Sequence, residues 1–583
     1  MAGPRSVTVR MGSAVRRVVG ARRRPRVIAT RPTITVPVGG RRSGTVAPAH
    51  PGFDDPNLRP ATHFHLDIGR PMLRGPGGFY DADHHRYSQR FIDPSAYELR
   101  LDASIGLQLL RKSATAMAAA APGNTGTGSG GGGGGKLIPD DLVAFTWTVF
   151  GKHSGFHRRE IVQRPITPME VAVFELPGRS DFYEVSLKVS FKNGAFSKRI
   201  VHVDVRDWLI VSLGDSSASG QGNPDQNGTV DHNKQGQRIC DFPTLAQIAG
   251  VTPPMNNAAE WVERKAYRSL AGVPAQAARS LARTSGQTFI PGAADVARFS
   301  FDRITFASFA RSGAEVLDGI IDPQGGDSDF IGAGQLEECR RTVKSRRIDA
   351  LMINIGGNDA GFSVVLEDLV SKDSIYTGSL RGTIKAAALA SIAGPPGDDK
   401  LARDQVAKRL SRLLGIGLPP GQKGELEVHY DMLRAAVQDL QRSPGVGQVY
   451  ITGYPIGLFD VRQPDGAIGF KSCEIFDGPD IDLTMADGRM IKTHGRNLNA
   501  LIARKAREFD WHFIDVEQEF EGHGYCSTQP FWRTAKQSCF AQGDFNGTMH
   551  PNTEGVRVWA AKYAKRMRDH TIATRGEDPM LRP

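Results

Sequence analysis

The sequence of 583 residues predicts an α/β protein in which a parallel sheet is covered by helices on both faces, preceded by a small all-β domain and a disordered basic arm. Two patterns lead to this prediction. Strand and helix patterns alternate after residue 207, which is typical of parallel sheets. Before residue 207, apolar and polar residues alternate with a period of two. The length also permits more than one domain, at roughly 150 residues per domain.

The disordered arm is expected over residues 1–60. Residues 1–53 contain eleven arginines but no lysine and no acidic residue, and the rest of the chain has equal numbers of basic and acidic residues. The net charge of +11 therefore indicates no specific nucleic-acid partner. The arm can make non-specific contacts with anionic polymers or lipid head groups, or it is a solvated tail without function. No apolar run of signal-peptide length follows the arginines, and no stretch of about 20 apolar residues predicts a membrane span.

The all-β domain is expected over residues 90–206. Apolar residues alternate with polar ones on both sides of the turn Asn193-Gly194, which predicts a β-hairpin with one buried face. A Gly-rich insertion, 105–140, separates two earlier strands. The strands expected here cover residues 97–104, 144–149, 183–191 and 201–205. The pattern is similar to PKD or Ig-like β-sandwiches, and it favours a spacer or packing partner over a carbohydrate-binding module.

The α/β region is expected over residues 207–575. Apolar runs indicate its strands, and the residues between them carry apolar positions at helical spacing, as in 498–509. Strands are expected at 208–213, 303–310, 349–355, 447–453 and 512–517. Residues 372–445 form a helical insertion between the third and fourth strands, and it either covers the substrate cleft or lies at the periphery.

A candidate nucleophile follows the first of these strands. The segment 214–220 reads Gly-Asp-Ser-Ser-Ala-Ser-Gly and begins where an apolar run ends. Reactive groups of α/β sheets lie at the carboxyl ends of strands, so Ser216 is the candidate. Gly313 and Asn358 follow the next two strands, and His550 precedes a helical pattern. Taken singly, these residues have simpler explanations, such as a packing glycine or an Asx turn that caps a helix.

The motifs Gly-Asp-Ser-Ser, Arg-Ser-Gly-Ala, Gly-Gly-Asn-Asp and His-Pro-Asn, in this order, resemble the SGNH (GDSL-type) hydrolase family. Segments 261–278 and 520–526 are similar to its secreted actinobacterial lipase and esterase branch. The resemblance implies a three-layer flavodoxin-like sheet, a secreted or cell-surface location, and catalytic roles for Ser216, Gly313, Asn358 and His550, with no cofactor and no metal. It also implies a disulfide between Cys526 and Cys539, which leaves an odd thiol among Cys240, Cys339 and Cys473.

The four residues suit ester hydrolysis through an acyl-enzyme. A histidine with an unperturbed pKa of about 6.5 can take the proton of a serine hydroxyl. The N–H groups of Ser216 and Gly313, together with the side-chain amide of Asn358, can bind the oxygen that becomes negative during attack. The expected substrate is an acyl lipid or an acetylated carbohydrate.

One position departs from the family. The family carries an aspartate three residues before the histidine, where this chain has Gly547. A backbone carbonyl within residues 544–548 can fix the imidazole instead, and this is the favoured interpretation. The side chain of Asp544 is the alternative orienting group.

Two other function classes are disfavoured by the residues present. A metallophosphoesterase would need further metal ligands beside Asp215, but the residue three positions later is Ala218. A carbohydrate-binding or adhesion protein with a degenerate hydrolase domain would not be expected to retain Ser216, Asn358 and His550 together.

Overall fold

The structure is a computed structural model. It describes residues 65–68, 73–74, 79–94, 96–103, 142–163, 171–177, 181–191, 194, 196–231, 234–241, 252–284, 288–290, 297–325, 333–361, 407–408, 410–471, 473 and 485–572. The predicted arm, the Gly-rich insertion and residues 372–406 of the predicted helical insertion lie outside the described residues.

Five parallel strands form the part of the central sheet that positions the candidate site. They are β10 (Phe196–Gly214), β14 (Ala297–Ser308), β15 (Ile348–Asn354), β16 (Val446–Thr452) and β19 (His512–Ile514). Their order in the sheet is β14-β10-β15-β16-β19, and each adjacent pair is parallel. Numbered along the chain this is 2-1-3-4-5, the flavodoxin-like order. Every residue of β15 is buried, as expected for a strand covered on both faces.

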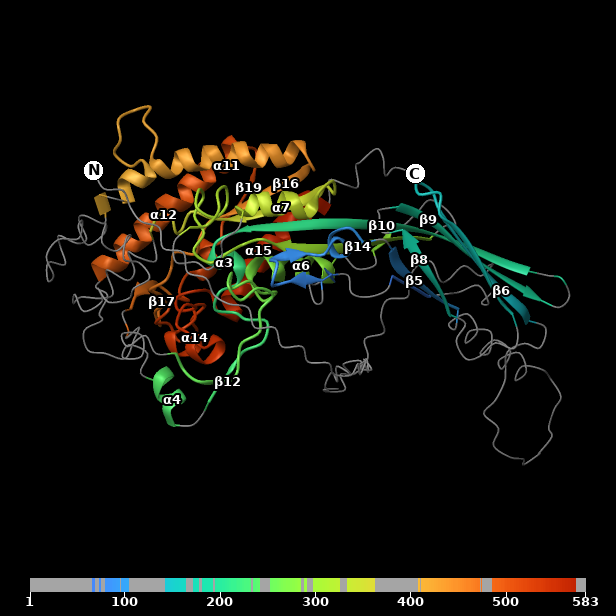
Figure 1. Cartoon of the computed structure of the whole chain (residues 1–583), viewed down its shortest axis with the longest axis horizontal. Helices are drawn as coiled ribbons and strands as arrows, with labels where there is room; N and C mark the ends of the chain where they lie inside the picture. The colour runs from blue at the N-terminus through green and yellow to red at the C-terminus, as the bar shows by residue number, and fades with distance from the viewer. Residues whose placement is uncertain are drawn as a thin grey trace, which may run out of the picture. The chain divides into compact units, whose positions relative to one another are not determined.

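Helices cover both faces of this sheet (Figure 1). One face carries α7 (Gln335–Val343), α11 (Glu425–Arg442) and α12 (Met485–Glu508), and the other carries α6 (Val273–Thr284) and α15 (Thr553–Met567). The α/β prediction is therefore confirmed. None of the described helices is long and apolar enough to cross a bilayer.

The described part of the predicted helical insertion belongs to this cover. Helix α11 buries residues at helical spacing, namely Leu426, Tyr430, Leu433, Val437 and Leu440. It packs against α7, α12 and β16. Helix α11 follows β15 and precedes β16 in the chain, and it packs on the face of the sheet that also carries α7 and α12.

A second hydrophobic core lies between the three-stranded sheet and the antiparallel part of the central sheet. The three-stranded sheet consists of β1 (His65–Ile68), β5 (Ala96–Asp102) and β8 (Val171–Pro177). From the central sheet, β6 (Leu142–Gly151), β9 (Asp181–Phe191) and the first half of β10 contribute core residues, and β7 (His157–Gln163) pairs with β6. The predicted hairpin is confirmed, since β9 pairs antiparallel with β10. Its alternating residues, such as Val185 and Val203, are buried together with Leu99 and Phe174.

The predicted separate all-β domain ending at residue 206 is not supported, because β10 continues through that position. The first half of β10 pairs with β9 over Phe196–Val205 and the last residues pair with β15 over Ile210–Gly214. On its other side, β10 pairs with β14 over Val201–Ser212. One ladder of hydrogen bonds thus joins both regions, and among the described residues ten strands form a single sheet.

The remaining elements are short. The strands are β2 (Leu73–Arg74), β3 (Tyr80–Asp81), β4 (Arg86–Tyr87), β11 (Thr229–Val230), β12 (Met255–Asn257), β13 (Thr288–Ile290), β17 (Asp460–Arg462) and β18 (Ile468–Phe470). The helices are α1 (Gln89–Ile92), α3 (Ser216–Ser219), α4 (Lys234–Asp241), α13 (Glu517–Phe520), α14 (Ala535–Gln542) and the π-helix η3 (Arg568–Ile572).

Two disulfides are present, and neither is the predicted pair. Cys240 bonds to Cys539 and Cys473 bonds to Cys526, which leaves Cys339 as a buried free thiol. The prediction of a bond between Cys526 and Cys539 is wrong because α14, which carries Cys539, packs against α4, which carries Cys240. The two disulfides thus link the segments before α15 to distant parts of the chain. The predicted disulfide would instead have closed a short local loop.

Candidate active site

The candidate nucleophile lies at the carboxyl edge of the sheet between β10 and β15. The N–H of Asp215 donates to the carbonyl oxygen of Asn354 at 3.0 Å, which joins the ends of these two strands. The carboxylate of Asp215 caps α3 by accepting from the N–H of Ser217 at 3.0 Å. Ser216, the first residue of α3, is half-buried. This is the point where the strand order reverses, and ligands of such sheets bind there.

The side chain of Asn358 contacts the turn that contains Gly313. The amide Nδ2 of Asn358 donates to the carbonyl oxygen of Ala314 at 2.9 Å, and Ala314 follows Gly313. Within the described part of the chain, no acceptor is paired with the N–H group of Ser216 or with that of Gly313. These two N–H groups and the second hydrogen of the Asn358 amide remain open to a ligand.

His550 has a fixed tautomer. Its Nδ1 lies 3.1 Å from the carbonyl oxygen of Thr548. A carbonyl oxygen only accepts, so Nδ1 carries the proton and Nε2 of the neutral ring keeps its lone pair. Burial lowers the pKa of His550 to about 4, so the imidazole is neutral at ordinary pH. The favoured orienting group, a carbonyl within 544–548, is the group found at Nδ1.

The turn after Ser216 is attached to the loop that carries His550. The N–H of Gln221 donates to the carbonyl oxygen of Ser216 at 3.1 Å, while the Gln221 amide donates to the carbonyl oxygen of Asn546. A Cβ placed on Gly222 would lie 3.4 Å from the Cβ of His550. Ser216 and His550 thus stand on adjoining turns. The Ser216 hydroxyl makes no hydrogen bond to the imidazole or to any other described residue.

The loop before His550 is held in a strained conformation. Met549 has a φ of 59°, a region that side chains other than glycine seldom adopt. Two backbone hydrogen bonds hold it there, from Met549 N–H to the Arg533 carbonyl at 2.9 Å and from Arg533 N–H to the His550 carbonyl at 2.8 Å. Strain of this kind persists only where surrounding contacts enforce it, and it is concentrated at functional sites.

Neighbouring atoms leave no room for a side chain at Gly547. A Cβ on Gly547 would lie 2.6 Å from the Cα of Gly222 and 2.9 Å from the Oγ of Ser538. A contact of 2.6 Å with backbone requires the turn after Ser216 to move. An aspartate, which the resemblance would place three residues before His550, therefore does not fit between these two turns.

The carboxylate of Asp544 contacts residues other than His550. It accepts from the hydroxyl of Tyr267 at 2.8 Å, from the N–H of Asn546 at 2.9 Å and from the Gln542 amide. The Asp544 carbonyl oxygen also accepts from the Ser538 hydroxyl at 2.8 Å. These contacts fold the loop between α14 and α15, and none of the described contacts of Asp544 reaches His550.

The sequence patterns did not indicate Tyr454, which follows β16. Its hydroxyl donates to the carboxylate of Asp215 and accepts from the N–H of Gly357 at 3.0 Å. Burial raises the pKa of Asp215 to about 7, although the hydrogen bonds from Tyr454 and Ser217 oppose the rise. A tyrosine directly after a strand of the sheet was the available signal, because that position faces the carboxyl edge.

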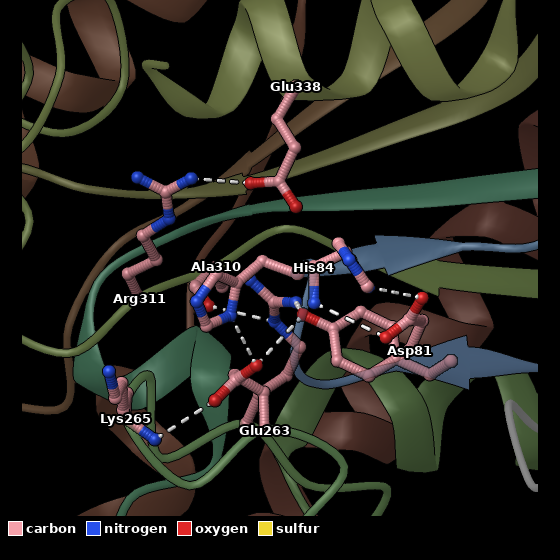
Figure 2. A network of polar contacts seen from close by, with 10 residues as sticks. Asp81, His84, Glu263, Lys265, Ala310, Arg311 and Glu338 are labelled. Carbon is pink, nitrogen blue, oxygen red and sulfur yellow. Dashed lines mark hydrogen bonds and ion pairs between the residues drawn. The ribbon is translucent and has the colours of Figure 1, made fainter. Parts of the chain in front are cut away.

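A separate polar network joins the residues before β5 to the α/β region (Figure 2). Glu263 accepts from the backbone N–H of Lys265 and contacts the ring of His85, while buried Arg311 is paired with Glu338. A cavity of about 680 Å³ beside this network has a lining that includes Arg311, Glu338 and Lys344 but none of the candidate catalytic residues. The network fixes the N-terminal segment of the described chain against the end of β14.

Across the described residues, no group of three or more histidine, cysteine, aspartate or glutamate side chains is arranged to hold an ion.

Comparisons with known proteins give the following results. No protein-family model matches the sequence, and no curated protein matches it. Among solved structures, the extracellular lipase of Streptomyces rimosus is 19% identical with a TM-score of 0.33, covering 62% of this chain and 99% of the lipase. Phospholipase A1 of Streptomyces albidoflavus NA297 is also 19% identical, with a TM-score of 0.31 and coverages of 62% and 98%. A gut microbial diltiazem-metabolizing enzyme is 11% identical, with a TM-score of 0.25 and coverages of 62% and 46%.

Proposed function

We propose that this protein is a serine esterase of the SGNH type that hydrolyses carboxylic esters through an acyl-enzyme. The observation that supports this most directly is the arrangement at the carboxyl edge of the sheet. Ser216, Gly313 and Asn358 end three adjacent strand–turn units there, and the loop of His550 is bound to the turn after Ser216. Open N–H donors, a half-buried hydroxyl and a histidine of fixed tautomer are the groups that acyl transfer requires.

The proposed first half-reaction forms the acyl-enzyme on Ser216. The Ser216 Oγ attacks the acyl carbon while its proton passes to Nε2 of His550. The carbonyl oxygen becomes negative and accepts hydrogen bonds from the N–H groups of Ser216 and Gly313 and from the Asn358 amide. The tetrahedral intermediate then releases the alcohol, which takes the proton from His550, and the acyl group remains on Ser216.

Water completes the reaction. His550 Nε2 takes a proton from water as its oxygen attacks the acyl carbon, and the same N–H donors bind the second oxyanion. Collapse of this intermediate returns the proton to Ser216 Oγ and releases the acid. Throughout, the Thr548 carbonyl holds the proton at Nδ1 and stabilises the imidazolium that forms.

A panel of p-nitrophenyl esters from acetate to palmitate tests the proposal and separates the two expected substrate classes. A maximum at long chains favours an acyl lipid, and activity confined to acetate favours an acetylated carbohydrate. Assays before and after EDTA treatment address the metallophosphoesterase class, because the proposed reaction does not need a metal. Absence of hydrolysis of every ester, with binding to a glycan retained, would favour the carbohydrate-binding alternative.

The pH dependence is expected to follow His550. Protonated imidazole cannot accept the Ser216 proton, and burial lowers the pKa of His550 to about 4. As the pH falls, hydrolysis should therefore persist until the pH nears 4, well below the value of about 6.5 for an exposed histidine. Initial rates of p-nitrophenyl butyrate hydrolysis under subsaturating substrate measure this limb. The Asp215 carboxyl, whose pKa burial raises to about 7, also titrates in this range. An acidic midpoint near 6.5 that persists in Asp215→Asn would therefore show that the imidazole is solvated.

Asp544→Asn is expected to change turnover little. The carboxylate contacts Tyr267 and Asn546 rather than His550, so the variant removes no group from the imidazole. Loss of a true triad acid costs about 10⁴-fold in kcat. A loss of that size in kcat for p-nitrophenyl butyrate, with the melting temperature unchanged, would identify Asp544 as the orienting group.

A further inference from the structure

Tyr454 joins two turns of the candidate site through one oxygen atom. Its hydroxyl donates its single proton to the Asp215 carboxylate and accepts the N–H of Gly357 at 3.0 Å. Asp215 precedes Ser216, and Gly357 precedes Asn358. Burial and the nearby Asp215 raise the pKa of Tyr454 well above its usual range, so the hydroxyl keeps the proton that it donates.

The backbone of Tyr454 is held by a side chain of α12. The side-chain amide of Asn499, on α12, accepts from the N–H of Tyr454 at 2.8 Å and donates to its carbonyl oxygen at 2.8 Å. Asn499 is buried. The Tyr454 ring packs directly on Gly357, because a Cβ there would lie 3.0 Å from the ring atoms Cε1 and Cζ. The hydroxyl is thus fixed by a helix on one side and by backbone contact on the other.

The connection spans strands that are not neighbours. Ser216 follows β10 and Asn358 follows β15, whereas Tyr454 follows β16, which pairs with β15 and not with β10. The last backbone hydrogen bond between these two strand ends runs from the N–H of Asp215 to the carbonyl oxygen of Asn354 at 3.0 Å. Beyond it, the Tyr454 hydroxyl supplies a side-chain link between the two turns. A hydroxyl that follows β16 and bonds to both turns fixes their separation.

That separation matters for the reaction described above. Attack by Ser216 and oxyanion binding by Asn358 act on the two atoms of one carbonyl group. Donors must lie about 2.7–3.1 Å from the position that the oxyanion will occupy, and a displacement of about 1 Å can cost about 10²-fold in rate. Ground-state binding of the acyl and alcohol parts does not depend on this alignment to the same degree.

We propose that Tyr454 is a positioning residue that sets the Asn358 amide at its working distance from Ser216. The inference rests on the proposed esterase function. Tyr454 acts through Asp215 and the backbone of Gly357, and no direct contact with substrate is required of it.

Tyr454→Phe tests the inference with the full chain. The change removes only the hydroxyl, so kcat for p-nitrophenyl butyrate should fall about 10²-fold while KM stays nearly constant. Inactivation by a p-nitrophenyl alkylphosphonate, whose adduct on Ser216 places an oxygen in the oxyanion site, should slow in parallel. Tyr563→Phe is the matched control: Tyr563 is a buried tyrosine whose hydroxyl donates to the Ile353 carbonyl at 3.2 Å, and its loss should leave kcat unchanged.

A double variant separates positioning from a general loss of stability. Once Asn358→Ala has removed the amide, its placement no longer matters, so adding Tyr454→Phe should cost much less than it does alone. A double variant that loses the product of both single effects would overturn the inference. Should Tyr454→Phe fold poorly, Asn499→Ala replaces it in the double-variant test. It removes the two hydrogen bonds that hold the Tyr454 backbone and keeps the hydroxyl, and its effect on kcat should likewise be smaller when Asn358→Ala is present.

Failure of this inference is distinguishable from failure of the proposed function. If Ser216→Ala remains active, the esterase mechanism fails, and the role of Tyr454 fails with it. If Ser216→Ala is inactive but Tyr454→Phe matches Tyr563→Phe in kcat and in phosphonate reactivity, only the positioning role is refuted.

Discussion

Ser216→Ala is expected to lower kcat for p-nitrophenyl butyrate by about 10⁴-fold or more, because it removes the proposed nucleophile. In a serine hydrolase the nucleophile and its base act as a unit, and loss of either costs about 10⁶-fold in well-studied cases. The residue is half-buried and its hydroxyl has no hydrogen bond among the described residues, so alanine should leave the melting temperature nearly unchanged.

His550→Ala provides the comparison for this variant. It should lose a similar factor, and the double variant with Ser216→Ala should be no worse than either single one, since both residues serve the same step. An active Ser216→Ala protein, or a double variant whose losses multiply, would contradict a shared acyl-transfer step. Trapping of a butyryl group on the peptide that contains Ser216, by mass spectrometry of acid-quenched enzyme, tests the nucleophile directly.

Asn358→Ala is expected to lower kcat by about 10²–10³-fold, the usual cost of removing one oxyanion donor. Because the donor binds an oxygen that is negative only in the transition state, KM should change far less than kcat. The same substitution leaves the Ala314 carbonyl without the amide that donates to it at 2.9 Å.

Thermal unfolding of Asn358→Ala shows whether that loss weakens the fold. Two N–H donors remain in the variant, so residual activity above that of Ser216→Ala is also expected. Equal increases in KM and decreases in kcat/KM, with kcat unchanged, would assign Asn358 to substrate binding instead of to the oxyanion.

Local patterns predicted the parts of the fold that depend on local physics. The alternation around the turn Asn193-Gly194 specifies which face of a hairpin is buried, and Val185 and Val203 are buried as expected. The five apolar runs specify strands, and their alternation with helical patterns predicts the parallel sheet. The strands β10, β15 and β16 end within one residue of the expected positions, and a glycine lies at or soon after the end of each.

Contacts between distant segments were harder to predict. The strand β10 begins before the expected boundary at residue 206, because a strand that changes partners leaves no break in its own pattern. Cys539 pairs with Cys240 rather than with Cys526, since the pairing depends on how α4 packs. Gly547 departs from the expected aspartate for the same kind of reason, namely the approach of Gly222 within 2.6 Å of its Cβ position.

The residues of the candidate site also differ in whether a local sequence pattern indicates them. Ser216, Asn358 and His550 could be proposed as candidates from the sequence because each belongs to a short motif that follows a strand or precedes a helix. Tyr454 could not, because its role depends on a hydroxyl reaching two turns across the sheet edge. A side chain whose contacts join two separate motifs is not part of either motif, so no local pattern indicates it.

The unbroken path of β10 has a consequence for how the protein loses its structure. Over Val201–Val205 this strand is hydrogen-bonded to β9 on one side and to β14 on the other. Unfolding of the β9–β10 hairpin would therefore remove the strand that pairs with the first residues of β14. The antiparallel ribbon and the catalytic layers should therefore melt in one cooperative transition. A chain cut to begin at residue 207 would expose a fresh strand edge and be prone to self-association.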